Sequence, residues 1–329
     1  MTRMAAGCVI GVDLGGTKLL AGVVDADLNV HHRVFRHSRE GKNTEELLDA
    51  LVAAVDEARD AADGEVGAVG FGIPSLVDAR TGVARTTVHL PLHDVPFRDV
   101  MAERLGVPVV VDNDANAAMV AEHRRGAARG ASTAALLTLG TGIGGGIIVD
   151  NKLVHGASGA AGEWGHMVVE VNGPACTCGD NGCLETLVSG SALGRAGLRV
   201  ARDVPGSGLG RALAAGRDIT GMLVTELAHD GDQAARDVVA LMGTYLGVGI
   251  ANVVNILNPE IVCVGGGVVA AGDLLLEPAR RVVAERALAP SRDEVRIVPT
   301  RFGDASGMMG AALLAMDLLH QSAGSSEAA

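Results

Sequence analysis

The chain has 329 residues, of which 48% are hydrophobic and only 2% aromatic, so its cores must be built from Val, Leu, Ile and Ala. That length is enough for two domains, and the composition favours a buried sheet flanked by aliphatic helices. A net charge of −12 argues against a nucleic-acid partner, because a phosphate backbone needs a basic face, but backbone amides and Mg²⁺ can still bind a nucleotide.

The first part of the chain predicts a run of strands followed by alternating helices and strands. The segment 43–62 is the clearest helix, since Leu47 and Leu51 share its apolar face. Asn43 with Glu46 resembles a capping box at its start. The predicted strands are 9–14, 19–24, 29–37, 66–73 and 107–111, and the other predicted helices are 97–105 and 113–125.

A second, similar pattern begins after a Gly/Ala/Arg-rich hinge candidate at 126–132. Both parts open with a strand, a glycine turn and a second strand, which indicates a duplicated fold. The later predicted elements are strands 133–139, 147–149, 260–264 and 294–298, helices 232–257, 272–289 and 305–320, and short helices within 201–231. We expect a smaller domain of 1–125 plus 303–329, with the last helix returning to it, and a larger domain of 126–302.

The cysteines and the apolar runs bear on localisation. An odd number of cysteines points to a reducing compartment, and Cys8 and Cys263 sit in strand-like runs as inert core residues. The first strand begins near residue 8, which leaves no room for a signal peptide, and no run approaches the roughly 20 apolar residues of a membrane span. We therefore expect a soluble, cytoplasmic protein without a membrane partner.

Two glycine turns are candidate phosphate loops, because glycine lets backbone N–H groups approach phosphate oxygens. They are DLGGTK at 13–18 and LGTGIGGG at 139–146. The second contains a G-x-G-x-x-G pattern, but a strand follows it where a dinucleotide site needs a helix. Plain hairpin turns would explain either loop alone, whereas two matched loops favour phosphate binding. A third close-approach site, 265–267, follows a strand and would pass under a nucleotide base or ribose.

A polar cluster, DNDAN at 112–116, follows a Val-rich strand. The carboxyl end of a strand is the usual ligand position in an open α/β sheet. Helix capping explains one of these polar residues but not four. The pattern disfavours a calcium loop, because the required Gly and terminal Glu are replaced by Ala117 and His123. Asp114 is our candidate general base.

Three of the five cysteines lie within eight residues, with one histidine just upstream, in an H-x9-C-x-C-x4-C pattern. Three thiols and an imidazole suit a tetrahedral zinc ion, and four protein ligands would make that zinc structural. Unpaired buried cysteines are the alternative, but this loop is rich in Gly, Asn, Asp and Pro. The predicted ligands are His166, Cys176, Cys178 and Cys183. Glu163 and Glu185 flank them and would accept hydrogen bonds from a polyhydroxylated ligand.

These motifs together resemble the ROK family, which comprises bacterial sugar kinases and sugar-responsive repressors. The resemblance covers essentially the whole chain, and within the family the chain is most similar to the glucokinases. It implies a duplicated actin-like ATPase (ribonuclease H-like) α/β fold with two domains around a central cleft. The matching pieces are DLGGTK at 13–18, VDNDANAA at 111–118, LGTGIGGG at 139–146, GxxGxxGEWGH at 156–166, CTCGDNGCLE at 176–185 and GGG at 265–267.

The resemblance also implies roles for individual residues. Asp114 would take the proton from the sugar 6-hydroxyl, and Asp13 would help to place Mg²⁺. His166 would serve both zinc and sugar. The residues implied around the sugar are Asn113, Asp114, Glu163, His166 and Glu185, and those implied around ATP are Gly15, Gly16, Thr17, Lys18, Gly140, Thr141, Gly142, Gly265 and Gly266.

The implied function is ATP-dependent phosphorylation of glucose by a homodimer or homotetramer. Fructose, mannose or an N-acetylhexosamine as substrate, and polyphosphate as donor, are open alternatives, and Leu187, where the family often has an aromatic residue, bears on sugar preference. A sugar-sensing repressor is the remote alternative. Such repressors carry a DNA-binding extension before the first strand, which here starts near residue 8.

Overall fold

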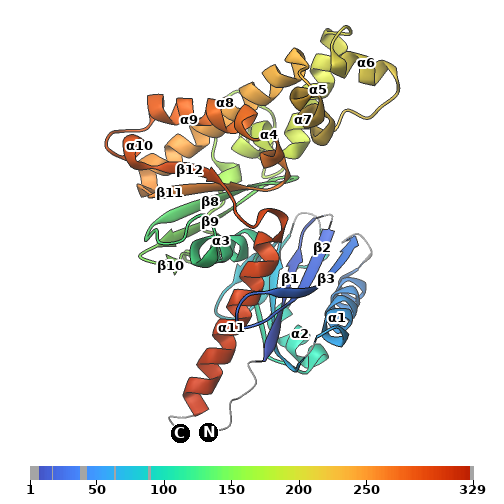
Figure 1. Ribbon diagram of the computed structural model, residues 1–329, viewed down its shortest axis with the longest axis vertical. Coiled ribbons are helices and arrows are strands. Elements are labelled where there is room, and N and C mark those ends of the chain that lie inside the picture. The colour runs from blue at the N-terminus through green and yellow to red at the C-terminus, as the bar shows by residue number, and fades with distance from the viewer. Residues whose placement is uncertain (1–6, 17, 38–42, 63, 88–89, 327–329) are drawn as a thin grey trace. The chain divides into compact units, whose positions relative to one another are not determined.

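The chain divides into two compact units in the computed structural model, which describes residues 7–326 without 17, 38–42, 63 and 88–89 (Figure 1). Unit 1 comprises Met1–Gly126, Leu153–Ala161 and Ala305–Ala329, and unit 2 comprises Ala127–Lys152 and Gly162–Asp304. The expected division differs chiefly at 153–161, which belongs with unit 1. The physical reason is a pair of close contacts: His155 hydrogen-bonds Asp112, and Gly159 lies directly against the backbone of Val77.

Unit 1 is built on a five-stranded sheet of order β3-β2-β1-β4-β7. The first three strands are antiparallel neighbours joined by turns, whereas β4 and β7 run parallel to β1 and are reached through helices, as parallel connections require. The strands are β1 (Cys8–Leu14), β2 (Lys18–Val24), β3 (Val30–His37), β4 (Val66–Ile73) and β7 (Val109–Asn113), and β5 (Leu76–Asp78) pairs with β6 (Val83–Thr86).

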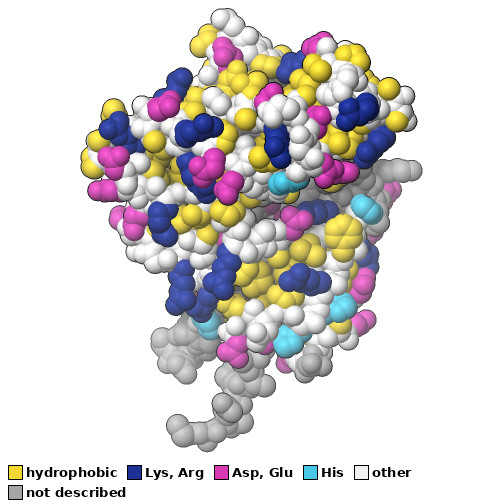
Figure 2. Space-filling model, turned by 45° about the horizontal axis from the view of Figure 1, so that its top comes forward, with side chains coloured by type: hydrophobic (Ala, Val, Ile, Leu, Met, Phe, Trp, Pro, Cys, Tyr) yellow, Lys and Arg dark blue, Asp and Glu magenta, His cyan; other side chains and the backbone are white. Residues whose placement is uncertain are grey.

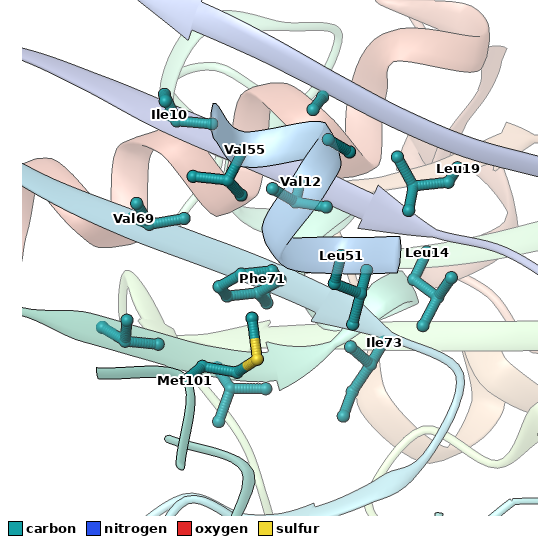
Figure 3. Close-up of a cluster of buried hydrophobic side chains, with 14 of the residues drawn as sticks. Ile10, Val12, Leu14, Leu19, Leu51, Val55, Val69, Phe71, Ile73 and Met101 are labelled. Carbon is teal, nitrogen blue, oxygen red and sulfur yellow. The ribbon is translucent and has the colours of Figure 1, made fainter. Parts of the chain in front are cut away.

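Two helices cover one face of this sheet, α1 (Thr44–Asp60) and α2 (Phe97–Leu105). The predicted capping box of α1 is confirmed: Asn43 Oδ1 accepts the Glu46 N–H at 3.0 Å, and Asn43 Nδ2 donates to Glu46 Oε1 at 2.9 Å. Figure 3 shows the aliphatic core between these layers, in which the Phe71 ring lies beside Met101.

The opposite face of the sheet carries α3 (Asp114–Arg125) and α11 (Ser306–Ser326). A Cβ at Gly11 or Gly70 would overlap backbone atoms of α11. Glycine at these strand positions therefore lets the last helix approach β1 and β4 closely. In this way the final segment of the chain becomes part of unit 1.

Unit 2 repeats the same topology, with a sheet of order β10-β9-β8-β11-β12. β8 and β9 are antiparallel, and β11 and β12 are parallel to β8, so the predicted duplication is confirmed. The strands are β8 (Ala134–Leu139), β9 (Ile143–Val149), β10 (Lys152–Leu153), β11 (Ile261–Gly265) and β12 (Arg296–Pro299). The helices are α4 (Leu184–Val188), α5 (Gly190–Asp203), α6 (Gly208–Ala214), α7 (Gly221–His229), α8 (Gln233–Leu257), α9 (Asp273–Arg286) and α10 (Ser291–Glu294).

Two sequence expectations change in unit 2. β9 begins at Ile143, so half of the predicted glycine turn is strand. The expectation that no segment approaches a membrane span was wrong. The 25-residue helix α8 is long enough and apolar enough to span one, judged by length and composition alone. More than half of its most apolar window is buried, and its glycines Gly243 and Gly247 lie against the α9 backbone. Packing of α8 as a core helix of unit 2 accounts for that composition.

Candidate active site

In unit 1 the polar residues predicted from the sequence gather at the corner between β7 and α3. Asn113 caps α3, since its Oδ1 accepts the N–H groups of Ala115 at 2.9 Å and Asn116 at 3.2 Å. Asp114 is the first residue of α3, where a carboxylate is favoured by the helix dipole. Helix capping was the alternative explanation for the polar residues at this corner. Asn113 performs that capping, so Asp114 is an additional carboxylate there.

The first glycine turn lies at the same end of the unit 1 sheet. In the parallel register Asp13 of β1 pairs with Gly72 of β4, and Gly72 pairs with Asp112 of β7. A Cβ on Gly72 would press on the Asp114 backbone, so glycine lets α3 start close to the sheet. The structure therefore brings Asp13 and the β7–α3 corner to one sheet edge, as expected for a ligand site.

The turn between β1 and β2 is closed by a hydrogen bond from Gly15 N to Lys18 O at 2.7 Å. Gly16 lies at its tip, and Thr17 lies outside the described residues. Asp13 sits against α11, where a Cβ at Gly307 would contact its carboxyl group. The turn and the acid together form an edge at which phosphate and a cation could bind.

In unit 2 the second glycine turn meets two other segments. Gly140 O accepts the Gly190 N–H at 2.8 Å, and Thr141 O accepts the Ser191 hydroxyl at 3.1 Å. The start of α5 therefore braces this turn. Sequence reasoning missed Gly190 and Ser191, because α5 was not predicted at 190–203.

The third glycine site is next to the second. Gly266 has a left-handed φ of 84°, and a Cβ there would overlap the backbone of Leu139, the residue before the turn. A Cβ on Gly265 would meet the Thr300 side chain, whereas Gly267 has open space around it. The structure thus joins 139–142, 189–191 and 265–267 into one surface of close backbone contacts within unit 2.

Glu185 lies against the second glycine turn. Its Oε2 accepts the Ile143 N–H at 2.9 Å, and a Cβ on Gly142 would overlap the same oxygen. Glycine at 142 is therefore required by this carboxylate. One Glu185 oxygen is thus engaged at the protein backbone, which positions the carboxylate.

Glu163 precedes the short helix η2 (Trp164–His166) and is near Glu185. Desolvation raises the pKa of Glu163, His166 opposes that rise, and the charge of Glu185 adds to it. The Glu163 side chain is 44% exposed, so solvent screens these interactions. Trp164 fills the space left by Gly145, where a Cβ would overlap its ring. Glu163 and Glu185 are thus close enough within unit 2 for their charges to interact.

The four predicted metal ligands converge in unit 2. The ligand atoms of His166, Cys176, Cys178 and Cys183 all lie within 4.8 Å of one another. Two edges are 3.6 Å (Cys178 Sγ to Cys183 Sγ) and 3.7 Å (Cys176 Sγ to His166 Nδ1). A tetrahedral zinc with Zn–S bonds of about 2.3 Å gives edges of roughly 3.8 Å. The donor set and spacing therefore fit zinc.

The thiols and the histidine have distinct surroundings. A hydrogen bond from the Asp180 backbone lowers the pKa of Cys178 to about 7, while burial raises that of Cys183 to about 12. His166 turns Nδ1 to the thiols, and its Nε2 lies 3.9 Å from Glu163 Oε2. One histidine therefore links the cysteine cluster to the paired carboxylates.

Comparison with known proteins gives consistent results. A sequence model of the ROK family matches residues 9–318. The glucokinase of Thermotoga maritima is 35% identical over 306 residues, covering 92% of this chain and 96% of that protein.

A crystal structure of a ROK family glucokinase from Streptomyces griseus, in complex with glucose and AMPPNP, matches with a TM-score of 0.86 and 36% identity over 94% of this chain and all of that one. The xylose repressor of Caldicellulosiruptor bescii is 30% identical, over 95% of this chain and 79% of the repressor.

Proposed function

Because this chain belongs to the ROK family, we propose that it is an ATP-dependent hexose kinase whose substrate is glucose. Its two units of equal topology have the actin-like ATPase fold of that family, and its glucokinase relatives support hexokinase-type phosphotransfer. The observation that carries the proposal is the β7–α3 corner. There Asn113 caps α3, and Asp114 is an additional carboxylate on the first residue of the helix. A carboxylate so placed suits the removal of a proton from a sugar hydroxyl.

Phosphoryl transfer depends mainly on positioning and charge stabilisation, which this chain's residues can supply. The two glycine turns, at 15–18 and 140–142, would surround the ATP phosphates. The N–H groups of Gly15 and Gly140 donate within the turns, so other backbone N–H groups of the turns would bind the phosphates. Gly265 and Gly266 would pass beneath the nucleoside. Asp13 would hold Mg²⁺, which neutralises the charge on the phosphates. Asn113, Glu163, His166 and Glu185 would orient the sugar, and Asp114 would accept the proton of its 6-hydroxyl.

The four-ligand cluster supports a structural zinc in the proposed enzyme. His166, Cys176, Cys178 and Cys183 would complete a tetrahedral shell and leave no open position for water. The proposed contribution of the metal is to fix the loop between His166 and Glu185. That loop places Glu163 and Glu185 at its two ends.

A panel assay tests the proposed function. The purified protein should phosphorylate glucose with ATP, and glucose should have the highest kcat/KM among glucose, fructose, mannose and N-acetylhexosamines. Preference for another hexose, or for polyphosphate, would change the assignment within the family. The similarity to a xylose repressor suggests the contrasting outcome, which is sugar binding without phosphorylation.

Two conservative substitutions test the paired carboxylates. Glu163→Gln and Glu185→Gln should each raise the KM for glucose by about 10- to 150-fold, because a hydrogen bond to a charged group is worth roughly 1.5–3 kcal/mol. The KM for ATP should stay near its wild-type value. Glu185→Gln keeps an oxygen that can still accept the Ile143 N–H, so its fold should be retained.

Wild-type KM values for every hexose in both variants would contradict the proposed sugar contacts. Asp180→Asn serves as a matched control, because that acid lies in the cysteine loop and its carboxylate accepts the backbone N–H of its neighbour Asn181.

We propose a cytoplasmic enzyme that forms a homodimer or homotetramer, without a membrane or nucleic-acid partner. Acidic and basic side chains are interspersed over the visible face of unit 2, with no large uniformly basic area there (Figure 2). A mass measurement in solution distinguishes the two assemblies.

A further inference from the structure

A histidine outside the predicted site residues is bonded to the β7–α3 corner. His155 Nε2 lies 2.7 Å from Asp112 Oδ2. His155 belongs to the segment 153–161, which joins β10 to the Glu163 loop and which we call the crossover segment. Gly156 and Gly159 have left-handed φ values, and Ala161 N donates to His155 O at 3.1 Å. The crossover segment is thereby folded back on itself with His155 at its base.

Asp112 is a buried carboxylate with both oxygens engaged. It is 6% exposed, and its Oδ1 accepts the Asn113 N–H at 2.7 Å and the Asn116 Nδ2 at 2.9 Å. Its Oδ2 faces His155. A buried carboxylate needs such partners, because an unpaired charge in the protein interior is strongly destabilising. The Asp112 carboxylate therefore binds three groups, the Asn113 N–H, the Asn116 amide and the His155 ring, two residues before Asp114.

The groups around His155 favour its charged form. The hydrogen bond that His155 donates to the Asp112 carboxylate raises the pKa of His155, against the lowering effect of burial. Another acid, Asp78, lies on β5, whose backbone packs against Gly159 of the crossover segment. The Asp78 carboxylate is bonded to the Arg80 and Thr81 N–H groups and to Arg85.

We propose that His155 is a positioning residue, which fixes the Asp112 carboxylate and through it the orientation of Asn113 and Asp114. This inference rests on the proposed kinase function. The physical link is short. His155 hydrogen-bonds the Asp112 carboxylate, and that carboxylate accepts the Asn113 backbone N–H. Asp114 is the next residue and the first of α3. Catalysis is sensitive to such placement, since a misplacement of about 1 Å can cost 10²-fold in rate.

Substitutions in the full-length protein test this role. His155→Ala should lower kcat by about tenfold, because the carboxylate loses its partner, while the KM for ATP should stay within about twofold of wild type. His155→Gln should restore most of kcat, since its amide can still donate to Asp112.

The matched control is His31→Ala. His31 Nε2 lies 2.6 Å from Asp25 Oδ2, so it forms the same kind of pair, but on β3 at the opposite edge of the same sheet. This variant should keep wild-type kcat. Wild-type kcat in His155→Ala would overturn the proposal. So would an equal loss of kcat in His155→Ala and His155→Gln, because that result means a purely structural role.

A thermal-unfolding series tests the ion pair without using activity. A raised pKa in the folded state means that the His155 contribution is complete below the unfolded pKa of about 6.5 and is lost as pH rises through the folded value. The difference in Tm between wild type and His155→Gln should therefore shrink as pH rises from about 5.5 to 8.5.

A difference in Tm that does not change with pH would overturn the charged His155–Asp112 pair, whereas the positioning role itself is decided by kcat in the two His155 variants. If the wild type phosphorylates no hexose, the proposed function fails, and the expected effect of the His155 variants on kcat fails with it. In that case the pH-dependent Tm difference still reports whether His155 pairs with Asp112, so the two failures are distinguishable.

Discussion

Asp114→Asn should lower kcat by about 10²–10⁴-fold, the contribution typical of a positioned general base. The amide keeps the size of the side chain and an oxygen that can accept the Ala115 N–H, as Asp114 Oδ1 does at 2.9 Å. It cannot take up the proton of a sugar hydroxyl. Steady-state kinetics with glucose and ATP measure the effect.

Folding should be nearly unaffected by the same substitution. The cap of α3 is Asn113, which remains, and the charge lost from the first turn is worth only about 0.3–1 kcal/mol. The Tm should therefore shift by a few degrees at most, and ATP binding should be intact. Asp112→Asn is the comparison variant, and its kcat should fall less because Asp112 supports the corner without receiving the proton.

A kcat above about a tenth of wild type in Asp114→Asn would place the general base elsewhere. The proposed mechanism would then fail even for a protein that phosphorylates glucose.

Cys178→Ser should remove zinc and most activity together. Wild-type protein should contain about one zinc per chain, and the variant much less, because one of four ligands is lost. Structural zinc contributes an apparent 10–16 kcal/mol of binding energy in small zinc domains, comparable to the stability of about 5–15 kcal/mol of a whole protein. The zinc loop, and the glutamates at its ends, should therefore lose their order. Elemental analysis and thermal unfolding measure the two effects.

Cys263→Ala provides the control for the thiol itself. Cys263 is buried in β11, outside the cluster, so its loss should leave the zinc content unchanged while costing some stability. Fully active wild-type protein without zinc would contradict the proposed role of the metal.

The fold was largely predictable because its signals are local. The amphipathic stripe and the Asn43–Glu46 box lie within a few helical turns, and they defined α1 from its start. The opening shared by β1–β2 and β8–β9 likewise needs only about twenty residues of sequence. The ligand spacing around Cys176, Cys178 and Cys183 is also local, since a tight loop must bring such close thiols together.

Sequence reasoning missed two segments. The polar and apolar residues of α5 do segregate at helical spacing, so its periodicity could have indicated a helix at 190–203, although it begins with glycine and has small residues on its buried face. The position of its start is determined by hydrogen bonds to the glycine turn 140–142. β9 starts four residues earlier than predicted because Gly145 is a strand residue packed under Trp164 and the Ile143 N–H donates to Glu185. A glycine suggests a turn in the sequence when the side chain that packs against it lies about twenty or more positions away, because that contact is not visible locally.

Sequence alone therefore determined the repeated topology, the helix caps and the identity of the polar clusters, because each depends on residues within one element or loop. Tertiary structure decided which clusters meet. Pairing of Asp13 with Gly72, and of Gly72 with Asp112, places the first glycine turn and the β7–α3 corner on one sheet edge. The bond between His155 and Asp112 spans 43 residues, and no periodicity or spacing encodes it. Such contacts arise only when separate strands and loops pack, since burial then forces each carboxylate to find a partner.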